Sequence, residues 1–358
     1  MAGEETIDGD SEQTAMREKP GWHFKNWLIA MKAAIAATTM LSGSAARGGD
    51  LAEELKTYPH RIVYETRQGD NWELFAIGAD GTVPVNLTKT SDVNEMYPHA
   101  SPDGARVAFV VDEGNGTSKV RNVYSMHLDG SGRARVAENA RQPCWNGKGT
   151  VLAYLHGESD KFTYTDYATK GLALFDLATG AHREHPNAGL HHLYNICWSP
   201  KGDWFISTVH AAAGYRHAIL AIEAEGQGVY NLNLPGCRPD VSPDGKKVAW
   251  GASDWTLRVG ELDFSGPEPK VNNIRDLVTS KEPMEVYHVD WSPDGRYVAF
   301  SRGPKLKRMG RAAEIVGIDA EGWNICVADA TTANRWTAIT SDGKSNKEPD
   351  WIYVGAKP

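Results

Sequence analysis

Several short motifs that mark catalytic and metal-binding proteins are missing from this chain. It contains no P-loop, no zinc-spaced Cys-x-x-Cys pair, no Cys-x-x-Cys-His haem site, no His-Glu-x-x-His and no Gly-x-Ser-x-Gly. These absences leave no recognised signature of nucleotide hydrolysis, structural zinc, covalent haem, zinc proteolysis or α/β-hydrolase chemistry. The function must therefore be inferred from the repeats rather than from a catalytic motif.

Excess positive charge and long apolar runs are also lacking. The formal net charge of −8 disfavours nucleic acid or an anionic membrane as the main partner. One apolar stretch, Trp27–Leu41, is interrupted by Lys32 and is too short to span a bilayer comfortably. It follows basic residues and precedes Ser44-Ala45-Ala46, a pattern that predicts a secretory signal peptide cut after Ala46. The alternative is a disordered tail with a short Ala-rich helix. Met16 would give the more usual start for such a peptide.

What the chain does contain is a repeat. A predicted strand that ends at a tryptophan, or at an equivalent position, recurs six times, about every 50 residues. In four of the six copies this position is followed by Ser-Pro-x-Gly. The clear copies begin at Ser101, Ser199, Ser242 and Ser292; Trp145–Gly149 is degenerate and Pro349–Trp351 is truncated. Pro and Asp suit the central positions of a tight turn, and Gly accepts the positive φ that closes it. Each copy therefore predicts a hairpin.

A second turn signal, usually x-Gly, follows each copy, so each unit holds two hairpins and four strands. Four-stranded units in series are typical of propeller blades. The segment Arg61–Glu65 enters the repeat as a second strand, whereas Trp351–Tyr353 is a first strand with no blade after it. Together they predict one split blade. We expect an all-β fold, a six-bladed β-propeller whose ring is closed by the C-terminal strand joining the N-terminal strands.

The strand–Ser-Pro-Asp-Gly–strand units with a later Asp-Gly turn resemble TolB-like propeller repeats, and the resemblance covers about residues 59 to 354. The resemblance implies the fold but does not specify a function. Among such proteins, the sequence most resembles the exported TolB-like proteins. TolB carries an α/β domain before its propeller, and we expect none here. The predicted organisation is 1–46, a signal peptide or N-terminal extension; 47–58, a linker; and 59–358, the propeller. The predicted location is periplasmic or secreted, with no stable membrane span after cleavage.

The four cysteines raise the question of disulfides in an exported protein. Cys144 and Cys197 occupy equivalent positions on neighbouring blades. Equivalent points on six inner strands form a hexagon, and a bridge across one side would demand a very narrow channel. Free buried thiols are therefore the favoured interpretation.

Propeller topology predicts which face carries a site. The Ser-Pro-Asp-Gly and later turns lie on one face, and the longer, more variable loops 112–119, 157–170, 210–217 and 303–322 lie on the other. Long loops on a rigid scaffold concentrate function. Within loop 157–170, aromatic residues alternate with charges, a pattern suited to sugar stacking or to pinning the loop. The basic stretch from Lys305 to Arg311 would attract an anionic partner or remain a solvated loop.

Alignment of the blades on the tryptophan position predicts two sets of channel residues near the long-loop face. The residue three positions before the tryptophan is of a different type in every blade, which fits the binding of a small polar ligand. Polar residues in a water-filled channel can also have a purely structural role. The predicted ligand-binding residues at the channel mouth are Tyr97, His99, Gln142, Asn195, Arg238, His288 and Glu348. The residue one before the tryptophan is Asp in three blades, where we expect a local hydrogen bond.

Several histidines fall near the same face, and together they allow a first-row divalent metal. The candidates are His192, His210 and His288. No cofactor is assigned with certainty. The set faintly resembles the metal-bearing oligogalacturonate lyases, which are also propellers.

Two functions follow from these patterns. The first is a binding or scaffold module of the bacterial envelope, which holds a protein or glycan on the long-loop face and binds no nucleic acid. The alternative is a metal-dependent polysaccharide lyase, or a related carbohydrate-active enzyme, in which the metal neutralises a uronate and a residue such as His288 or Tyr287 abstracts the proton. The sequence does not decide between a binding module and an enzyme.

Overall fold

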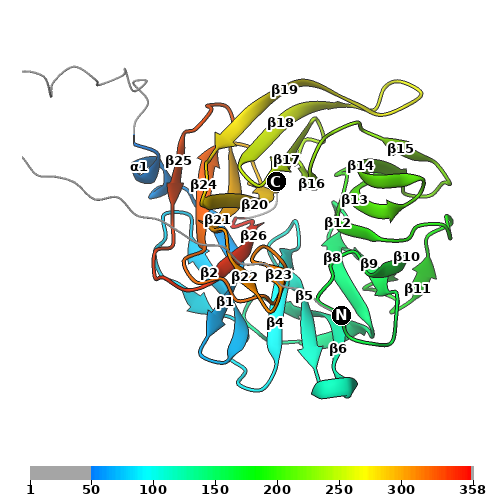
Figure 1. The fold of residues 1–358 in the computed structure, drawn as a ribbon, viewed down its shortest axis with the longest axis horizontal. Coiled ribbons are helices and arrows are strands. Elements are labelled where there is room, and N and C mark those ends of the chain that lie inside the picture. Colours follow the sequence, from blue (N-terminus) through cyan, green and yellow to red (C-terminus); the bar gives the residue numbers. More distant parts are fainter. Residues whose placement is uncertain (1–49, 356–358) are drawn as a thin grey trace, which may run out of the picture. The chain divides into compact units, whose positions relative to one another are not determined.

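The computed structural model describes residues 50–355. The predicted signal peptide therefore lies outside the described residues. Within 50–355, six four-stranded antiparallel sheets follow one another as the blades of a β-propeller, and their innermost strands surround a central axis (Figure 1). The predicted fold class and blade number are confirmed. No helix within these residues is long and apolar enough to cross a membrane.

The strands of the first three blades, from the innermost outward, have the following bounds. Blade 1 contains β26 (Asn346–Ile352), β1 (Arg61–Gln68), β2 (Asn71–Gly78) and β3 (Val85–Asn86); blade 2 contains β4 (Asn94–Ala100), β5 (Arg106–Glu113), β6 (Val120–His127) and β7 (Ala134–Ala137); blade 3 contains β8 (Ala140–Trp145), β9 (Val151–Gly157), β10 (Thr169–Asp176) and β11 (His182–Glu184).

The other three blades repeat this order. Blade 4 contains β12 (Leu193–Trp198), β13 (Trp204–Ala212), β14 (Tyr215–Glu223) and β15 (Val229–Asn231); blade 5 contains β16 (Cys237–Val241), β17 (Lys247–Ser253), β18 (Thr256–Asp263) and β19 (Lys270–Thr279); blade 6 contains β20 (Met284–Trp291), β21 (Tyr297–Pro304), β24 (Asn324–Asp329) and β25 (Trp336–Ala338). A small hairpin of β22 (Lys307–Arg308) and β23 (Arg311–Ala312) lies between β21 and β24, and a 3-10 turn, η1 (Gly116–Ser118), lies between β5 and β6.

The Ser-Pro-Asp-Gly turns form as the sequence predicts. In the first copy the Ser101 hydroxyl donates to the Asp103 carboxylate at 2.6 Å and accepts the Arg106 backbone N–H at 2.9 Å. Gly104 has a φ of +66°, and a Cβ at this position would overlap the Tyr353 carbonyl. The turn therefore requires glycine both for its backbone conformation and for the close approach of the chain's last described residues.

The split blade closes the ring. β26 pairs antiparallel with β1, with Ile62 opposite Trp351. The short helix α1 (Leu51–Leu55) precedes β1, and the Asp50 carboxylate caps it by accepting the Ala52 N–H at 3.1 Å. Leu51, Leu55 and Tyr58 are buried in the same cluster as Trp351. Part of the segment expected as a linker thus packs onto the propeller.

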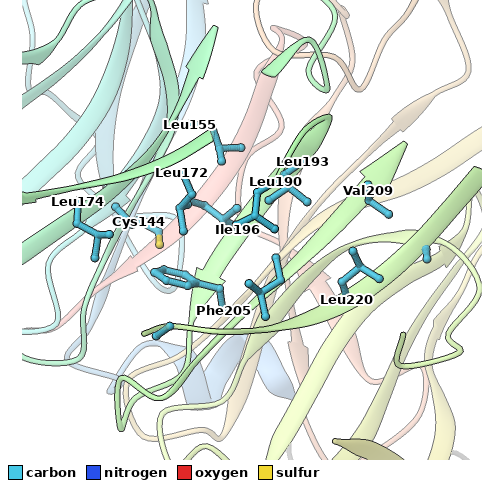
Figure 2. Close-up of a cluster of buried hydrophobic side chains, with 14 residues drawn as sticks. Cys144, Leu155, Leu172, Leu174, Leu190, Leu193, Ile196, Phe205, Val209 and Leu220 are labelled. Atoms are coloured by element: carbon cyan, nitrogen blue, oxygen red, sulfur yellow. The ribbon is translucent and has the colours of Figure 1, made fainter. Parts of the chain in front are cut away.

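Apolar residues that alternate along the strands pack between neighbouring blades. The cluster in Figure 2 joins blades 3 and 4 and includes Leu155 and Leu172 from one blade and Phe205 and Leu220 from the next. Each is at most 1% exposed, so each contributes roughly 1.5–3 kcal/mol by burial. The channel strands are therefore held by a core that lies outside the channel itself.

The cysteines behave as expected. All four are free; Cys144, Cys197 and Cys326 are buried and Cys237 is half-buried. Burial raises the pKa of each thiol, which keeps it protonated at neutral pH.

Three of the four predicted long loops are present, and one is not. Loop A, residues 158–168, separates β9 from β10, and loop B, residues 305–323, separates β21 from β24. The segment 112–119 contains η1. The prediction for 210–217 is wrong, because β13 and β14 continue into it and His210 pairs with His217 across the sheet. The pairing of β13 with β14 continues as far as Ala212 and Tyr215, so only a tight turn remains where the sequence predicted a loop.

Candidate functional site

The six residues that the alignment placed three before the tryptophan position share an unusual backbone. Each lies in the left-handed region, with φ between +49° and +59°, and each is at most 8% exposed; they are called the ring residues: Tyr97, Gln142, Asn195, Arg238, His288 and Glu348. A β-bulge interrupts the innermost strand of every blade at this place, for example between Met96 and His99. Left-handed backbone costs about 1–2 kcal/mol in a residue other than glycine. Six such residues therefore represent stored strain at one level of the channel.

Hydrogen bonds hold the bulges in place. The Tyr97 N–H donates to the Glu65 carboxylate at 3.0 Å, and the Arg238 N–H donates to the Thr208 hydroxyl at 2.9 Å. The Asn195 N–H donates to the side-chain oxygen of Gln142. Each acceptor comes from an adjacent strand or blade, so the strained backbone is supported by the surrounding sheets.

The ring side chains contact one another across the channel. The Asn195 amide donates to the Tyr97 hydroxyl at 3.0 Å. The carboxylate of Glu348 lies 3.4 Å from Arg238 Nη1 and 3.1 Å from His288 Nε2. The alignment thus identified residues that meet in space, although they come from six different blades.

Loop A covers the ring on one side. Its Asp166, 6% exposed, accepts a hydrogen bond from Arg238 at 2.9 Å, and the Asp166 carbonyl accepts one from Gln142. Arg141 donates to the Thr165 carbonyl at 2.9 Å. Burial lowers the pKa of Arg141 to about 10. Burial also acts to lower the pKa of Arg238, but the nearby carboxylates of Asp166 and Glu348 outweigh it and hold that pKa above its usual range.

Loop B covers the other side and is fixed by a buried lysine. Lys347, fully buried, donates from Nζ to the carbonyls of Ala313, Ile315 and Ile318 at 2.8–3.0 Å. Its counter-ion is Glu65, 3.6 Å away. The Glu314 carbonyl in the same loop accepts from His288 at 2.9 Å. The long-loop mouth of the channel is therefore closed by two loops, and the ring residues are buried beneath them.

Burial also sets the protonation of His288. It lowers the pKa of this imidazole well below its usual range, and the nearby charges of Arg238 and Lys347 act in the same direction. His288 is therefore neutral at physiological pH. A neutral imidazole here donates one hydrogen bond to the Glu314 carbonyl or to the Glu348 carboxylate.

A pocket of about 420 Å³ remains open on the long-loop face, beside the closed mouth. Residues of both charges line it, supplied by blades 1 and 2 and by both loops: Arg67, Asp70, Asp112, Lys119, Arg308 and Asp319, with Tyr164 and Met309. Lys119 lies over the Phe162 ring at 4.2 Å and donates to the Tyr164 hydroxyl at 3.1 Å. The aromatic residues of loop A thus contact blade 2, which favours the pinning role over free sugar stacking.

The candidate metal ligands are not arranged as a metal centre. His192 donates from Nδ1 to the His210 carbonyl at 3.1 Å, and its Nε2 lies 3.0 Å from the Glu158 carboxylate. His210 stacks on Tyr167 with 4.1 Å between ring centroids. Between residues 50 and 355, no three His, Cys, Asp or Glu side chains form a group that could hold a metal ion.

One residue before the tryptophan position, the three aspartates accept hydrogen bonds, but from the next blade and not locally as the sequence predicts. Asp240 accepts the Trp291 N–H at 2.8 Å, Asp290 the Trp351 N–H at 2.7 Å and Asp350 the Ala100 N–H at 2.8 Å. Each bond links one blade to the next. With His99, which lies 3.6 Å from the Asp350 carboxylate, these residues line the channel below the ring and extend toward the turn face.

Sequence reasoning did not identify Glu65, Asp166 and Lys347, which complete the network around the ring. Lys347 and Glu65 lie on the two strands that close the split blade. Glu65 directly follows the apolar run Ile62–Tyr64, and this is the signal that could have indicated a buried charged pair. Asp166 lies in a loop of variable length, where no repeat position marks it.

No protein-family model matches the sequence, and no curated protein is similar to it. Among solved structures, TolB from Acinetobacter baumannii has a TM-score of 0.58 and 17% identity, and the match covers 82% of this chain and 66% of TolB. Kuenenia stuttgartiensis hydrazine synthase has a TM-score of 0.55 at 11% identity over 85% of this chain and 48% of its own. A chain of a nidogen/laminin complex has a TM-score of 0.55 at 8% identity, over 82% of this chain and 98% of its own.

These identities establish a shared architecture and no shared activity. This chain spans less than two thirds of the TolB chain that it matches. The resemblance inferred from the Ser-Pro-Asp-Gly repeats is confirmed as a resemblance of fold. The chain is a six-bladed β-propeller, similar in fold to TolB.

Proposed function

We propose that this propeller is an exported binding module that holds a protein partner on its long-loop face. The observation that carries the proposal is the 420 Å³ pocket beside the closed channel mouth. Its volume is within the usual range for ligand sites, and its lining comes from two blades and two long loops.

The chemistry of the pocket supports a polypeptide partner. Arg67 pairs loosely with Asp319 at 3.6 Å, and both are partly exposed, so charges of both signs are presented at fixed places. The buried Asp112 holds Lys119 in position at 3.3 Å. Met309 is 71% exposed at the rim and supplies an adaptable apolar contact. A rim of mixed charge around an apolar residue is typical of a transient protein interface.

Site-specific photo-crosslinking in the native host tests this surface. A photoreactive amino acid at position 309 should give a discrete adduct, and the same probe at Val83, equally exposed at 73% but on the turn face, should give none. The purified partner should then bind at least about tenfold more weakly to Arg308→Glu, because the substitution reverses a rim charge. Equal adducts at both positions, or unchanged affinity in Arg308→Glu, would contradict the proposal.

Export has a separate test. The apolar stretch Trp27–Leu41 and the Ser44-Ala45-Ala46 sequence support cleavage after Ala46. Sequencing of the mature protein from the periplasm or medium should find Arg47 at or near the N-terminus. Recovery of an uncleaved chain in the cytoplasm alone would contradict export and leave the binding surface untouched.

The metal-dependent lyase gains no support from the arrangement of the described histidines and carboxylates.

A further inference from the structure

The opposite end of the channel opens as a wide funnel. A cavity of about 440 Å³ lies among the turns that connect the first and second strands of the blades. This end is called the turn-side funnel. Proline rings and tryptophan side chains form its wall: Pro102, Pro200, Pro243 and Pro293, with Trp145, Trp198, Trp291 and Trp351, and Tyr353 at the split blade. The wall is therefore apolar, although the turns around it are polar.

The floor of the funnel carries acidic side chains on one side only. Asp240, Asp290 and Asp350 supply three carboxylates from blades 5, 6 and 1, whereas the equivalent position in blades 2 and 4 is His99 and Cys197. The first three residues are consecutive around the ring. A ligand in the funnel would therefore meet an acidic half and a neutral half.

We propose that the turn-side funnel is a second binding site, which takes an ammonium group carried on an apolar stem, either a free alkylamine or a lysine side chain. The apolar wall suits the stem and the acidic half of the floor suits the cation. This site is independent of the long-loop face, and nothing in the function proposed above requires it.

The hydrogen bonds between blades do not by themselves explain why Asp240, Asp290 and Asp350 carry carboxyl groups. Each aspartate accepts a backbone N–H from the next blade, but Cys144 and Cys197 occupy the same place and face the backbone N–H groups of Trp198 and Val241. A neutral side chain therefore serves the same structural position. The hydrogen bonds between blades therefore do not require the carboxyl groups of the other three blades.

No protein cation balances these carboxylates. Within residues 50–355, none of the three makes an ion pair with a lysine or arginine, and His99 is the nearest basic group. Burial lowers the pKa of His99, so it is mostly neutral at neutral pH. Burial raises the pKa of Asp240 to about 7 and of Asp350 to about 8, and burial together with repulsion from the other two carboxylates also raises the pKa of Asp290. A bound cation would relieve this repulsion.

An unpartnered donor on the same wall also indicates a ligand. The indole N–H of Trp145 donates to the His99 carbonyl, and that of Trp291 donates to the Asp240 carbonyl. Trp351 is 5% exposed, yet its Nε1 has no hydrogen-bond acceptor among the described residues. A carbonyl or other acceptor next to the ammonium group would satisfy it. A peptide that carries a lysine has such a carbonyl.

Calorimetric titration of the purified protein tests the site. Hexylammonium is the probe, and hexanol and hexanoate are its neutral and anionic counterparts of similar length. We expect hexylammonium to bind and both counterparts to bind at least about tenfold more weakly, because only the cation gains from the carboxylates. A tripeptide with a central lysine, compared with one containing norleucine, decides the source of the cation. Tighter binding of the lysine peptide than of hexylammonium assigns the site to a polypeptide, and the reverse assigns it to a free amine.

Variants separate the charge from the fold. Asp240→Asn and Asp350→Asn keep an oxygen that can accept the backbone N–H, and each should weaken hexylammonium binding at least about tenfold. Asp263→Asn is the matched control, since Asp263 lies in an exposed turn at the outer edge of the same face and should change nothing. Thermal melting of each variant checks that it folds.

The wild-type protein provides an independent measurement. Asp240, Asp290 and Asp350 face one another and His99, so affinity for hexylammonium should rise between about pH 6 and pH 9 as the carboxylates ionise. Equal binding of hexanol and hexylammonium, no binding of either cationic probe at millimolar concentration, or affinity independent of pH would each overturn the proposal.

Discussion

The two ends of one channel use buried charge in opposite ways. At the long-loop mouth, Arg238 pairs with Asp166 and Glu348, and Lys347 pairs with Glu65. Two loops cover this whole network. At the turn-side funnel, three carboxylates have no lysine or arginine partner and the cavity is open. Paired ionic groups under a cover fix a structure, whereas unpaired acidic groups in an open cavity are typical of a site that awaits a partner.

The largest effect should come from removing the cation of the closed mouth. Lys347→Met leaves Glu65 buried without its counter-ion and three loop B carbonyls without a donor, so we expect destabilisation of about 3–5 kcal/mol. Chemical denaturation measures it, and limited proteolysis should cut loop B first. Lys344→Met is the control, because Lys344 is largely exposed at its surface contact with Gln68. Equal effects of both substitutions would show that the buried lysine does not hold the loop.

A buried aspartate on the loop side should behave like the lysine. Asp112 accepts two hydrogen bonds from Arg121 at 2.6 and 3.0 Å, and both side chains are nearly inaccessible. Asp112→Asn leaves the guanidinium without a charged partner and should destabilise the fold by about 3 kcal/mol. The shift of the denaturation midpoint at pH 7 measures it. A neutral result would mean that charge balance is unimportant at this end of the propeller.

The same substitution at the funnel should have the opposite sign. Burial raises the pKa of Asp350 to about 8 in the folded protein, above its unfolded value, so the folded state binds more protons between about pH 4 and pH 8 and loses stability as pH rises through that window. Asp350→Asn keeps an acceptor for the Ala100 N–H and should stabilise the protein by about 1–3 kcal/mol at pH 8.

That gain should shrink toward pH 4, where the wild-type carboxyl is neutral in both states. Denaturation curves at pH 5 and pH 8 give the comparison. Destabilisation at pH 8 would show that the Asp350 charge supports the fold rather than opposing it.

The smallest effect concerns the attachment of loop A to blade 4. A hydrogen bond with Glu158 raises the pKa of His192, whereas burial lowers that of His217. The His192–Glu158 pair is half exposed, so it should contribute no more than about 0.5 kcal/mol, present at low pH and lost as pH rises through the folded pKa. Histidine NMR titration should find His192 deprotonating at higher pH than His217. The reverse order would mean that the pair does not form in solution.

The architecture could be predicted from the sequence because the same turn residues recur from blade to blade. Ser101, Asp103 and Gly104 make local contacts, and local contacts repeat whenever the residues repeat. The ring residues were found by counting back from those turns. Their left-handed backbone was not expected, because a bulge depends on what the neighbouring strand offers at that point, as Glu65 does for Tyr97.

The closure of the long-loop mouth was not predictable in the same way. It depends on where loops A and B fold back, and that is decided by single long-range contacts such as Asp166 with Arg238. The repeat also directed attention to the long-loop face alone. The prolines of the turns, interpreted from sequence as scaffold, also form the wall of the funnel on the other face.

One strand takes part in both ends of the channel. β26 carries Lys347 and Glu348 for the closed mouth and Asp350 and Trp351 for the funnel, and it is also the strand that joins β1 to complete the ring. Neither end can be assembled until this strand docks. The pairing of β26 with β1 therefore completes both ends of the channel at once, so a chain with an open ring would lack the closed mouth and the funnel together.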